Sequence, residues 1–254
     1  EAGLSLTETY CCTGQIDVSG QVFRCHNRSG HGDMDMVDAM MKSCNPYFIQ
    51  LGLKVGAQRL LEMTERFGFG DRVSLADGMA VSAGTAPSLS QLQSPAAVAN
   101  LSFGQGTLMA SPVQICRMMA VVANGGMLVT PKLVLGTTSD GRTLTRNADA
   151  PAVRILSQDI SAQLQSFLIH CVMVEEGQNA LPSNNTAGGK TATAQTGRYD
   201  ENGEEYEHGW FAGFYPAVNP KYVITVLAEN SGFGNGTAAP VFAEIVEQLT
   251  ARGW

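Results

Sequence analysis

The sequence has 254 residues, of which 44% are hydrophobic and 15% charged, and its formal net charge is −7. This composition is typical of a globular chain rather than a disordered one, and the length allows one large domain or two small ones. The acidic balance argues against general nucleic-acid binding, which needs a basic surface, and no apolar run approaches the roughly 18–20 residues of a membrane span.

The N-terminal part is predicted to hold short strands and loops followed by helices. Glycines punctuate residues 10–32, which favours loop and short strand there. A helix that begins at Asp35 should stop before Pro46, because a proline disfavours helix at the residue that precedes it. Helices are predicted over 35–42, 46–53 and 57–67.

The middle of the chain carries the clearest helix signal. Residues 74–95 are rich in Ser, Gly, Ala and Pro and are predicted to be an irregular loop. The segment 111–124 begins with a capping serine and a proline and ends at two glycines, which predicts a buried helix. Residues 136–150 are predicted to be a polar hairpin, and apolar residues at helical spacing predict a helix over 158–173.

The last 70 or so residues change in character. Three strand-like runs, "KTATAQT", "GWFAGFYP" and "YVITVLAEN", are separated by gaps too short for crossover helices, so antiparallel neighbours are expected. Pro240 is predicted to open a last helix. Helices followed by a sheet and a final helix indicate an α+β layer fold rather than a βαβ repeat.

The six cysteines leave several interpretations open. Cys11, Cys12 and Cys25 lie near His26 and His31 in a Gly-rich segment, but their spacing fits none of the usual zinc patterns. A Cys12–Cys25 disulfide, which requires an oxidising compartment, or free thiols are therefore favoured over a metal site. We expect no metal and no cofactor.

Two short segments suit catalysis by a serine enzyme. "GGKT" at Lys190 is not a phosphate-binding loop, because the required glycine five residues before Gly189 is missing and a strand follows. "SCN", with Ser43 and Asn45, lies where a helix breaks. A hydroxyl, a lysine and strand-edge N–H groups are what acyl transfer without a Ser-His-Asp triad requires.

These segments and their flanking text resemble the transpeptidase domain of class B penicillin-binding proteins, of the elongation or sporulation type. The boxes "SCN" and "KTA" match two of that family's three short motifs. The text "AMMKSCNPYFIQLG", "LSFGQGTLMASPVQICRMMAVVANGGMLVTPKLV" and "HGWFAGFYPA" extends the likeness over nearly the whole chain.

The resemblance implies a fold like that of penicillin-binding proteins and serine β-lactamases, with an antiparallel sheet flanked by helices and an active site beside the third strand of the family sheet. It makes 1–254 the C-terminal portion of a single transpeptidase domain, with a helical part over about 30–175. The third to fifth strands and the last helix would follow over about 187–254. The first strands and the catalytic helix would be missing.

The resemblance also implies roles for individual residues. Ser43 would relay protons, Asn45 would bind the substrate amide, and Lys190 would provide positive potential and support Ser43. Thr191 and Thr193 would bind the substrate carboxylate, and the Thr193 N–H would form half of the oxyanion hole. Ala192 stands where the family usually has glycine, so a modest effect on substrate fit is expected. Without the resemblance, a helix cap, a turn residue and strand-forming threonines would be the simpler interpretations.

The first family box, Ser-x-x-Lys, does not occur, since no serine has lysine three positions later. Because the chain starts without Met, we expect a truncated C-terminal portion rather than a degenerate homologue, and an inactive one by itself. A Ser-x-x-Lys just upstream of Glu1 would distinguish the two.

The implied activity is a peptidoglycan D,D-transpeptidase that cross-links stem peptides through an acyl-serine and binds β-lactams. A non-catalytic scaffold in a cell-wall complex, or a serine β-lactamase or β-lactam sensor, are the alternatives. Expected partners are stem peptides, β-lactams, a glycosyltransferase and the missing N-terminal part. The expected location is the extracytoplasmic face of the bacterial membrane, reached through an absent N-terminal anchor.

Overall fold

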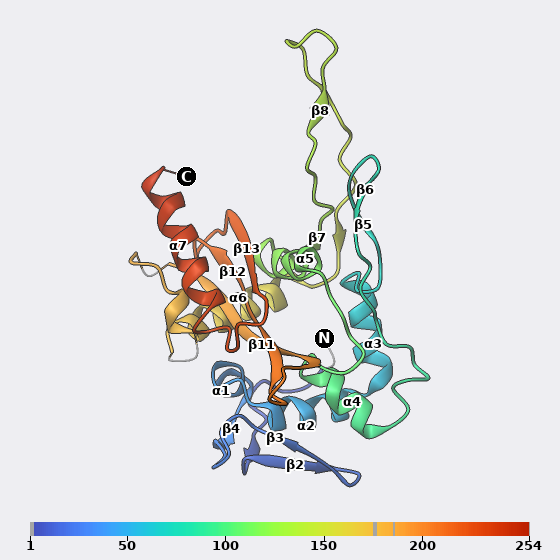
Figure 1. Cartoon of the computed structure of the whole chain (residues 1–254), viewed down its shortest axis with the longest axis vertical. Helices are drawn as coiled ribbons and strands as arrows, with labels where there is room; N and C mark the ends of the chain where they lie inside the picture. Colours follow the sequence, from blue (N-terminus) through green and yellow to red (C-terminus); the bar gives the residue numbers. More distant parts are fainter. Residues whose placement is uncertain (1–2, 175–176, 185, 254) are drawn as a thin grey trace.

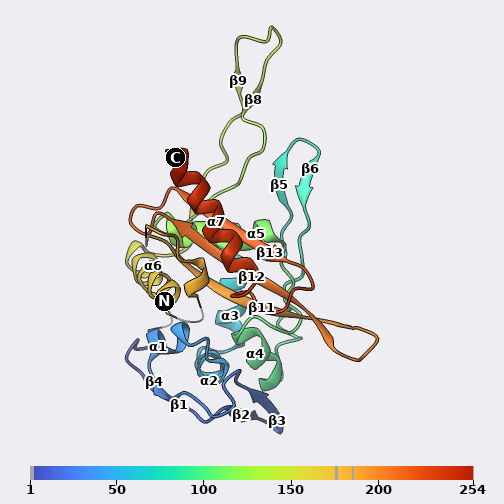
Figure 2. The ribbon, with the colours of Figure 1, turned by 60° about the vertical axis from the view of Figure 1, so that its left-hand side comes forward.

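A computed structural model describes residues 3–174, 177–184 and 186–253 of the chain. Helices lie on both sides of an antiparallel sheet, and a group of short hairpins and helices lies at one end (Figures 1 and 2). This is the α+β arrangement that the sequence predicts.

The main sheet has the strand order β11-β12-β13. Its strands are β11 (Gly188–Tyr199), β12 (Glu205–Tyr215) and β13 (Tyr222–Ala228). Both pairs are antiparallel, and Lys190 lies opposite Ala212 in the register. The three predicted strands and their antiparallel order are therefore confirmed. Within this sheet β11 is an edge strand, so one side of its backbone is not paired to β12.

Aromatic residues of β12 hold helices against both faces of the sheet. The helices are α5 (Pro112–Ala123), α6 (Gln158–Val172) and α7 (Ala238–Ala251). Phe211 packs against Phe242 of α7, with ring centroids 4.5 Å apart. Phe214 points to the other face, as side chains three apart on a strand must, and packs with Met119 of α5 and Leu168 of α6. Both phenylalanines of β12 are fully buried.

The N-terminal region packs below the sheet as two antiparallel strand pairs and four helices, drawn in blue to green in Figure 1. Cys12 and Cys25 lie in one of its apolar clusters, together with Met34 and Tyr47. The strand pairs are β1 (Tyr10–Cys12) with β4 (Gly32–Met34), and the hairpin β2 (Gln15–Val18) with β3 (Gln21–Arg24). The helices are α1 (Met36–Met41), α2 (Asn45–Val55), α3 (Ala57–Arg66) and α4 (Pro95–Ser102).

Short strand pairs extend away from the sheet. The longest projection carries β8 (Gly136–Thr137) and β9 (Thr145–Arg146), at the tip of the molecule in Figures 1 and 2. This confirms the hairpin predicted over 136–150. Further pairs are β5 (Val73–Ala76) with β6 (Met79–Val81), and β7 (Met127–Leu128) with β10 (Val153–Arg154). A single 3-10 turn covers Gln178–Ala180.

Three details differ from the sequence prediction. The segment predicted as an irregular loop contains the β5–β6 hairpin, and α4 follows it unpredicted. The signal for α4 is present, because the Ser94 side chain accepts a hydrogen bond from the Ala97 N–H and Pro95 follows the cap. Helix α7 begins at Ala238 rather than at Pro240, since a proline is tolerated where the backbone N–H has no helical partner. No helix within the described ranges has both the length and the apolar character needed to span a bilayer.

Candidate active site

The "SCN" segment forms the turn between α1 and α2. Ser43 has a φ of +48°, a left-handed conformation that non-glycine residues rarely adopt. Backbone hydrogen bonds from Ser43 to Met40 (3.3 Å) and from Cys44 to Ala39 (2.9 Å) close the turn. Asn45 is the first residue of α2. The turn therefore presents the Ser43 hydroxyl at a helix junction in a backbone conformation held by its surroundings.

The structure brings Lys190 to this turn from the far end of the chain. Lys190 is the third residue of β11, and its Nζ donates a hydrogen bond to Oγ of Ser43. The same Nζ lies 3.4 Å from both the carbonyl oxygen and Oγ1 of Thr191. Both Ser43 and Lys190 are half-buried. A cation and a hydroxyl in direct contact form a pair that can accept and return a proton.

Asn45 lies beside this pair in sequence, but its amide contacts another element. Its Nδ2 donates to the carbonyl oxygen of Arg24 at 3.4 Å, which links α2 to the end of β3. The predicted residues Ser43 and Lys190 are thus brought into contact. Asn45 is at the same turn, and its hydrogen bond to Arg24 ties it to the β2–β3 hairpin.

The remaining predicted residues follow Lys190 along the edge strand. Ala192 is exposed opposite Trp210, and Thr193 is half-buried opposite Gly209. The side of an edge strand that faces away from its neighbour can offer backbone N–H and C=O groups to an extended peptide, as in β-strand addition. The segment from Thr191 to Thr193 can therefore bind a peptide through its backbone while its hydroxyls contact a polar end group.

Sequence reasoning missed a glycine that packs against this strand. A Cβ added to Gly234 would lie 2.5 Å from the Ala192 carbonyl oxygen and 2.4 Å from that of Trp210. Only a residue without a side chain lets the loop before α7 approach so closely. The glycine-rich text "GFGNG" around this position is the signal that could have indicated it.

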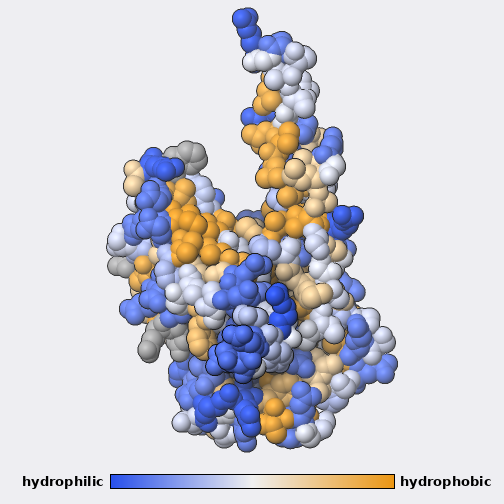
Figure 3. All heavy atoms as spheres, in the orientation of Figure 1, coloured by the Kyte–Doolittle hydropathy of each residue, from blue (hydrophilic) through white to orange (hydrophobic). Residues whose placement is uncertain are grey.

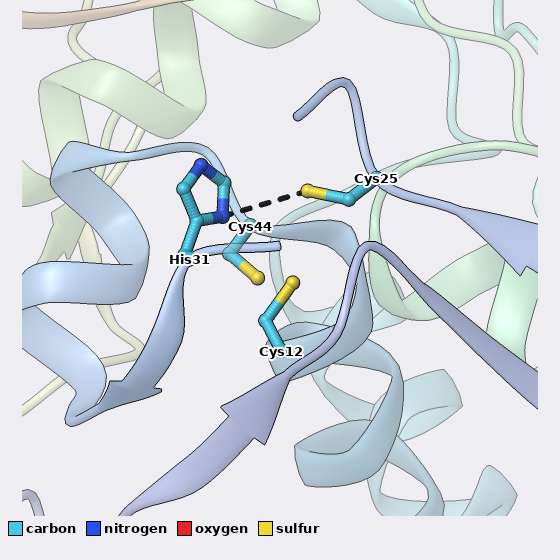
Figure 4. Close-up of side chains that lie close together, drawn as sticks. All are labelled: Cys12, Cys25, His31 and Cys44. Atoms are coloured by element: carbon cyan, nitrogen blue, oxygen red, sulfur yellow. Dashed lines mark hydrogen bonds between the residues drawn. The ribbon is translucent and has the colours of Figure 1, made fainter. Parts of the chain in front are cut away.

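A second group of reactive side chains includes Cys44, the middle residue of the "SCN" turn. The ligand atoms of Cys12, Cys25, His31 and Cys44 all lie within 4.8 Å of one another (Figure 4). Sγ of Cys25 lies 3.5 Å from Nδ1 of His31. All six cysteines are free thiols in the structure, so the Cys12–Cys25 disulfide is not formed. Among the residues that the structure describes, these four form the group of side chains that could hold a metal ion.

The electrostatics of this group favour a thiolate. A hydrogen bond with the Cys44 thiol lowers the pKa of Cys25, and the Asn27 backbone N–H and the two nearby histidines act in the same direction. The same hydrogen bond and burial raise the pKa of Cys44. The group therefore holds a negative charge on Cys25 first.

Comparisons with known proteins identify the family of the chain. The family model of the penicillin-binding protein transpeptidase domain matches residues 1–247. Stage V sporulation protein D of Bacillus subtilis is 31% identical over 242 residues, which cover 92% of this chain and 36% of that protein. Peptidoglycan D,D-transpeptidase PbpA of Mycobacterium tuberculosis is 29% identical, with 97% and 51% covered. The chain thus spans about a third to a half of the length of these relatives.

Solved structures share the fold. Penicillin-binding protein A of M. tuberculosis, as a ceftriaxone acyl-enzyme complex, superposes with a TM-score of 0.82 at 27% identity, covering 97% of this chain and 56% of that one. The transpeptidase domain of a peptidoglycan glycosyltransferase from Eggerthella lenta superposes at 0.85 with 21% identity, covering 98% and 61%, which supports the fold. On the strength of the family match over nearly its whole length, the chain belongs to the penicillin-binding protein transpeptidase domain family.

Proposed function

We propose that the protein carrying this chain is a peptidoglycan D,D-transpeptidase that binds β-lactams. The observation that carries the proposal is the contact between Lys190 and Ser43 at the start of an edge strand. The names of the relatives support it, since PbpA of M. tuberculosis is a peptidoglycan D,D-transpeptidase and penicillin-binding protein A is known as an acyl-enzyme.

The reaction has two steps around an acyl-serine. A serine hydroxyl attacks the carbonyl carbon between two D-alanines, and the terminal D-alanine leaves as an amine after taking a proton. The amine of a second stem peptide then attacks the ester and releases the serine, forming the cross-link. None of the 254 residues forms the Ser-x-x-Lys box, so we assign the nucleophile to a part of the protein outside this sequence.

The residues of this chain would bind the donor peptide and move its protons. Ser43, held by Lys190, would pass a proton to the leaving amine, and Asn45 would bind the substrate amide. The hydroxyls of Thr191 and Thr193 would bind the terminal carboxylate beside the Lys190 charge. The Thr193 N–H would donate to the developing oxyanion.

The substrate class also suggests the location and partners. Peptidoglycan lies outside the cytoplasmic membrane, so we place the protein at the extracytoplasmic face. A transpeptidase needs nascent glycan strands, which a glycosyltransferase supplies, and such an enzyme is the proposed partner.

Labelling with a fluorescent penicillin tests the proposal on the natural, full-length gene product. We expect one labelled serine, identified by mass spectrometry as the first residue of a Ser-x-x-Lys sequence, and slow release of the label. Absence of labelling in a folded protein would instead indicate the non-catalytic scaffold. Rapid hydrolysis of the β-lactam would indicate a β-lactamase.

A further inference from the structure

A thiol–imidazole cluster is formed by four side chains from separate short segments of the N-terminal region, Cys12, Cys25, His31 and Cys44. The pairing of β1 with β4 places Cys12 opposite Gly32, and therefore next to His31. Cys25 directly follows β3, and its N–H donates to the carbonyl oxygen of Gly14 at 2.9 Å. Cys44 is the residue before the first turn of α2. Figure 4 shows the four side chains pointing toward a common centre.

The spacing of the four atoms fits a tetrahedral zinc ion. With Zn–S bonds of about 2.3 Å and a Zn–N bond of about 2.0–2.1 Å, tetrahedral angles place sulfurs about 3.8 Å apart and a sulfur about 3.6 Å from the nitrogen. The observed Cys25 Sγ to His31 Nδ1 distance is 3.5 Å, and the most distant pair in the cluster is within 4.8 Å. A small contraction of the widest pairs is enough to complete the coordination.

Burial and composition indicate a closed site. Cys25 and Cys44 have no exposed surface, Cys12 is 3% exposed, and His31 is half-buried. A hydrophobic core of thiols alone does not need an imidazole nitrogen turned toward a sulfur, and here Nδ1 of His31 faces Cys25. Three thiolates and one histidine are a ligand set that structural zinc sites use.

We propose that the thiol–imidazole cluster binds one Zn²⁺ ion through the sulfur atoms of Cys12, Cys25 and Cys44 and through Nδ1 of His31. With four protein ligands the ion has no open position, so its role is structural. The Asn27 N–H donates a hydrogen bond to the Cys25 sulfur and would help to hold this ligand in place. This proposal departs from the expectation of no metal, which rested on the irregular spacing of the cysteines and histidines.

The ion would connect β1 and the end of β3, which carry Cys12 and Cys25, to the "SCN" turn, which carries Cys44. Cys44 stands between Ser43 and Asn45, so a bond from its sulfur to zinc fixes the backbone that carries both side chains. Ser43 is in a strained left-handed conformation, which the surrounding structure must hold. Cys44 is thus a positioning residue for Ser43 and Asn45, a consequence that rests on the proposed transpeptidase function.

Metal analysis of the natural, full-length gene product tests the site without any assay of catalysis. We expect one zinc per chain after purification without chelators, and loss of zinc to background in Cys12→Ser and in His31→Ala. Matched controls are Cys11→Ser, an exposed neighbour of Cys12, and His26→Ala, whose Nδ1 lies 3.9 Å from the Cys25 sulfur but outside the group of four. Both controls should retain one zinc per chain.

Two measurements on the unaltered protein test for the metal site even if a variant fails to fold. In the unaltered protein, alkylation of native thiols should spare Cys12, Cys25 and Cys44 and modify Cys11, and a zinc chelator should expose all three. Replacement of zinc by Co²⁺ should give thiolate-to-cobalt absorption in the near ultraviolet. A protein without zinc, with a disulfide among these cysteines, or with zinc retained in His31→Ala would overturn the site.

Acylation separates the structural site from its consequence. Removal of zinc should slow labelling by a fluorescent penicillin at least about tenfold, as loss of support around a metal ligand commonly does, and added Zn²⁺ should restore it. Zinc binding with unchanged labelling would overturn the positioning role alone. A protein that binds zinc but is never labelled would refute the proposed function and leave the metal site standing.

Discussion

Nζ of Lys190 donates a hydrogen bond to Oγ of Ser43, although 147 positions separate the two residues in the chain. The contact joins the sheet to the helical region, because Lys190 belongs to β11 and Ser43 to the turn between α1 and α2. A cation held against a hydroxyl keeps that oxygen available as a proton acceptor and stabilises negative charge near it.

Lys190→Ala is expected to slow acylation of the natural protein by a fluorescent penicillin by about 10²–10⁴-fold, the range typical of a lost proton-transfer group. Ser43→Ala should have an effect of the same order, and the double variant should be little worse than either single variant because the two act as one unit. The measurement is the second-order rate constant of labelling.

Lys221→Ala is the matched control for this prediction, since Lys221 is exposed and lies in the β12–β13 connection. It should label at the unaltered rate. Additive losses in the double variant, or normal labelling of Lys190→Ala, would contradict the assigned pair.

The sequence predicted the sheet and the long helices because their signals are local. β11 to β13 carry continuous strand-forming runs, and α5 has a serine cap, a proline and terminal glycines within its own text. The hairpin β5–β6 was missed because three- and four-residue strands in a Gly- and Ser-rich segment are formed by pairing rather than by propensity.

The candidate site also contains features that the sequence indicates and features that only the fold shows. The boxes around Ser43 and Lys190 were identified by likeness to a family, and only the fold shows that their side chains touch. A zinc site among Cys12, Cys25 and His31 was disfavoured because their spacing follows no short motif, and Cys44 was not among the candidates. The ligands of the thiol–imidazole cluster converge through the β1–β4 register and the start of α2, which spacing along the chain does not encode.

Gly189→Ala is expected to destabilise the protein by about 1–3 kcal/mol, the usual range for overpacking a filled core. A Cβ at Gly189 would lie 2.5 Å from Cζ of Phe211 and 2.7 Å from the Ala212 carbonyl oxygen. Urea unfolding measures the change. Gly236→Ala is the control, because its Cβ would meet only the Phe233 oxygen at 3.7 Å. Equal stability of the two variants would refute the close packing.

Gln114→Leu is expected to destabilise the protein by at least about 2 kcal/mol, because three carbonyl oxygens that contact this buried amide would lose their donor. Gln114 is 2% exposed, and its Nε2 lies 2.8 Å from the Ala83 oxygen and 3.3 Å from those of Gly68 and Asp71. Thermal unfolding of this variant should be compared with that of Gln93→Leu, an exposed position. A melting temperature unchanged in Gln114→Leu would show that these carbonyls find other partners.

Tyr47 gives a prediction for alkaline pH. Burial raises the pKa of Tyr47 to about 12, and the nearby Tyr10, Asp35 and Glu8 act in the same direction. An unfolded tyrosine has a pKa of about 10. Between these values the folded state binds more protons than the unfolded one, so the free energy of unfolding falls as pH rises. The stabilisation is complete below about pH 10 and is lost as pH rises toward 12.

Tyr47→Phe should remove this part of the pH dependence. At neutral pH it should cost about 0.5–1.5 kcal/mol, because the hydroxyl donates to the Glu8 carbonyl oxygen at 3.2 Å. Urea unfolding of Tyr47→Phe, of the unaltered protein and of the exposed control Tyr199→Phe at intervals from pH 8 to 12 isolates the effect, since each variant removes one phenol and keeps every other ionisable group. The unaltered protein and Tyr199→Phe should lose stability in parallel, and Tyr47→Phe more slowly. Three parallel curves would mean that burial does not disfavour the tyrosinate at this position.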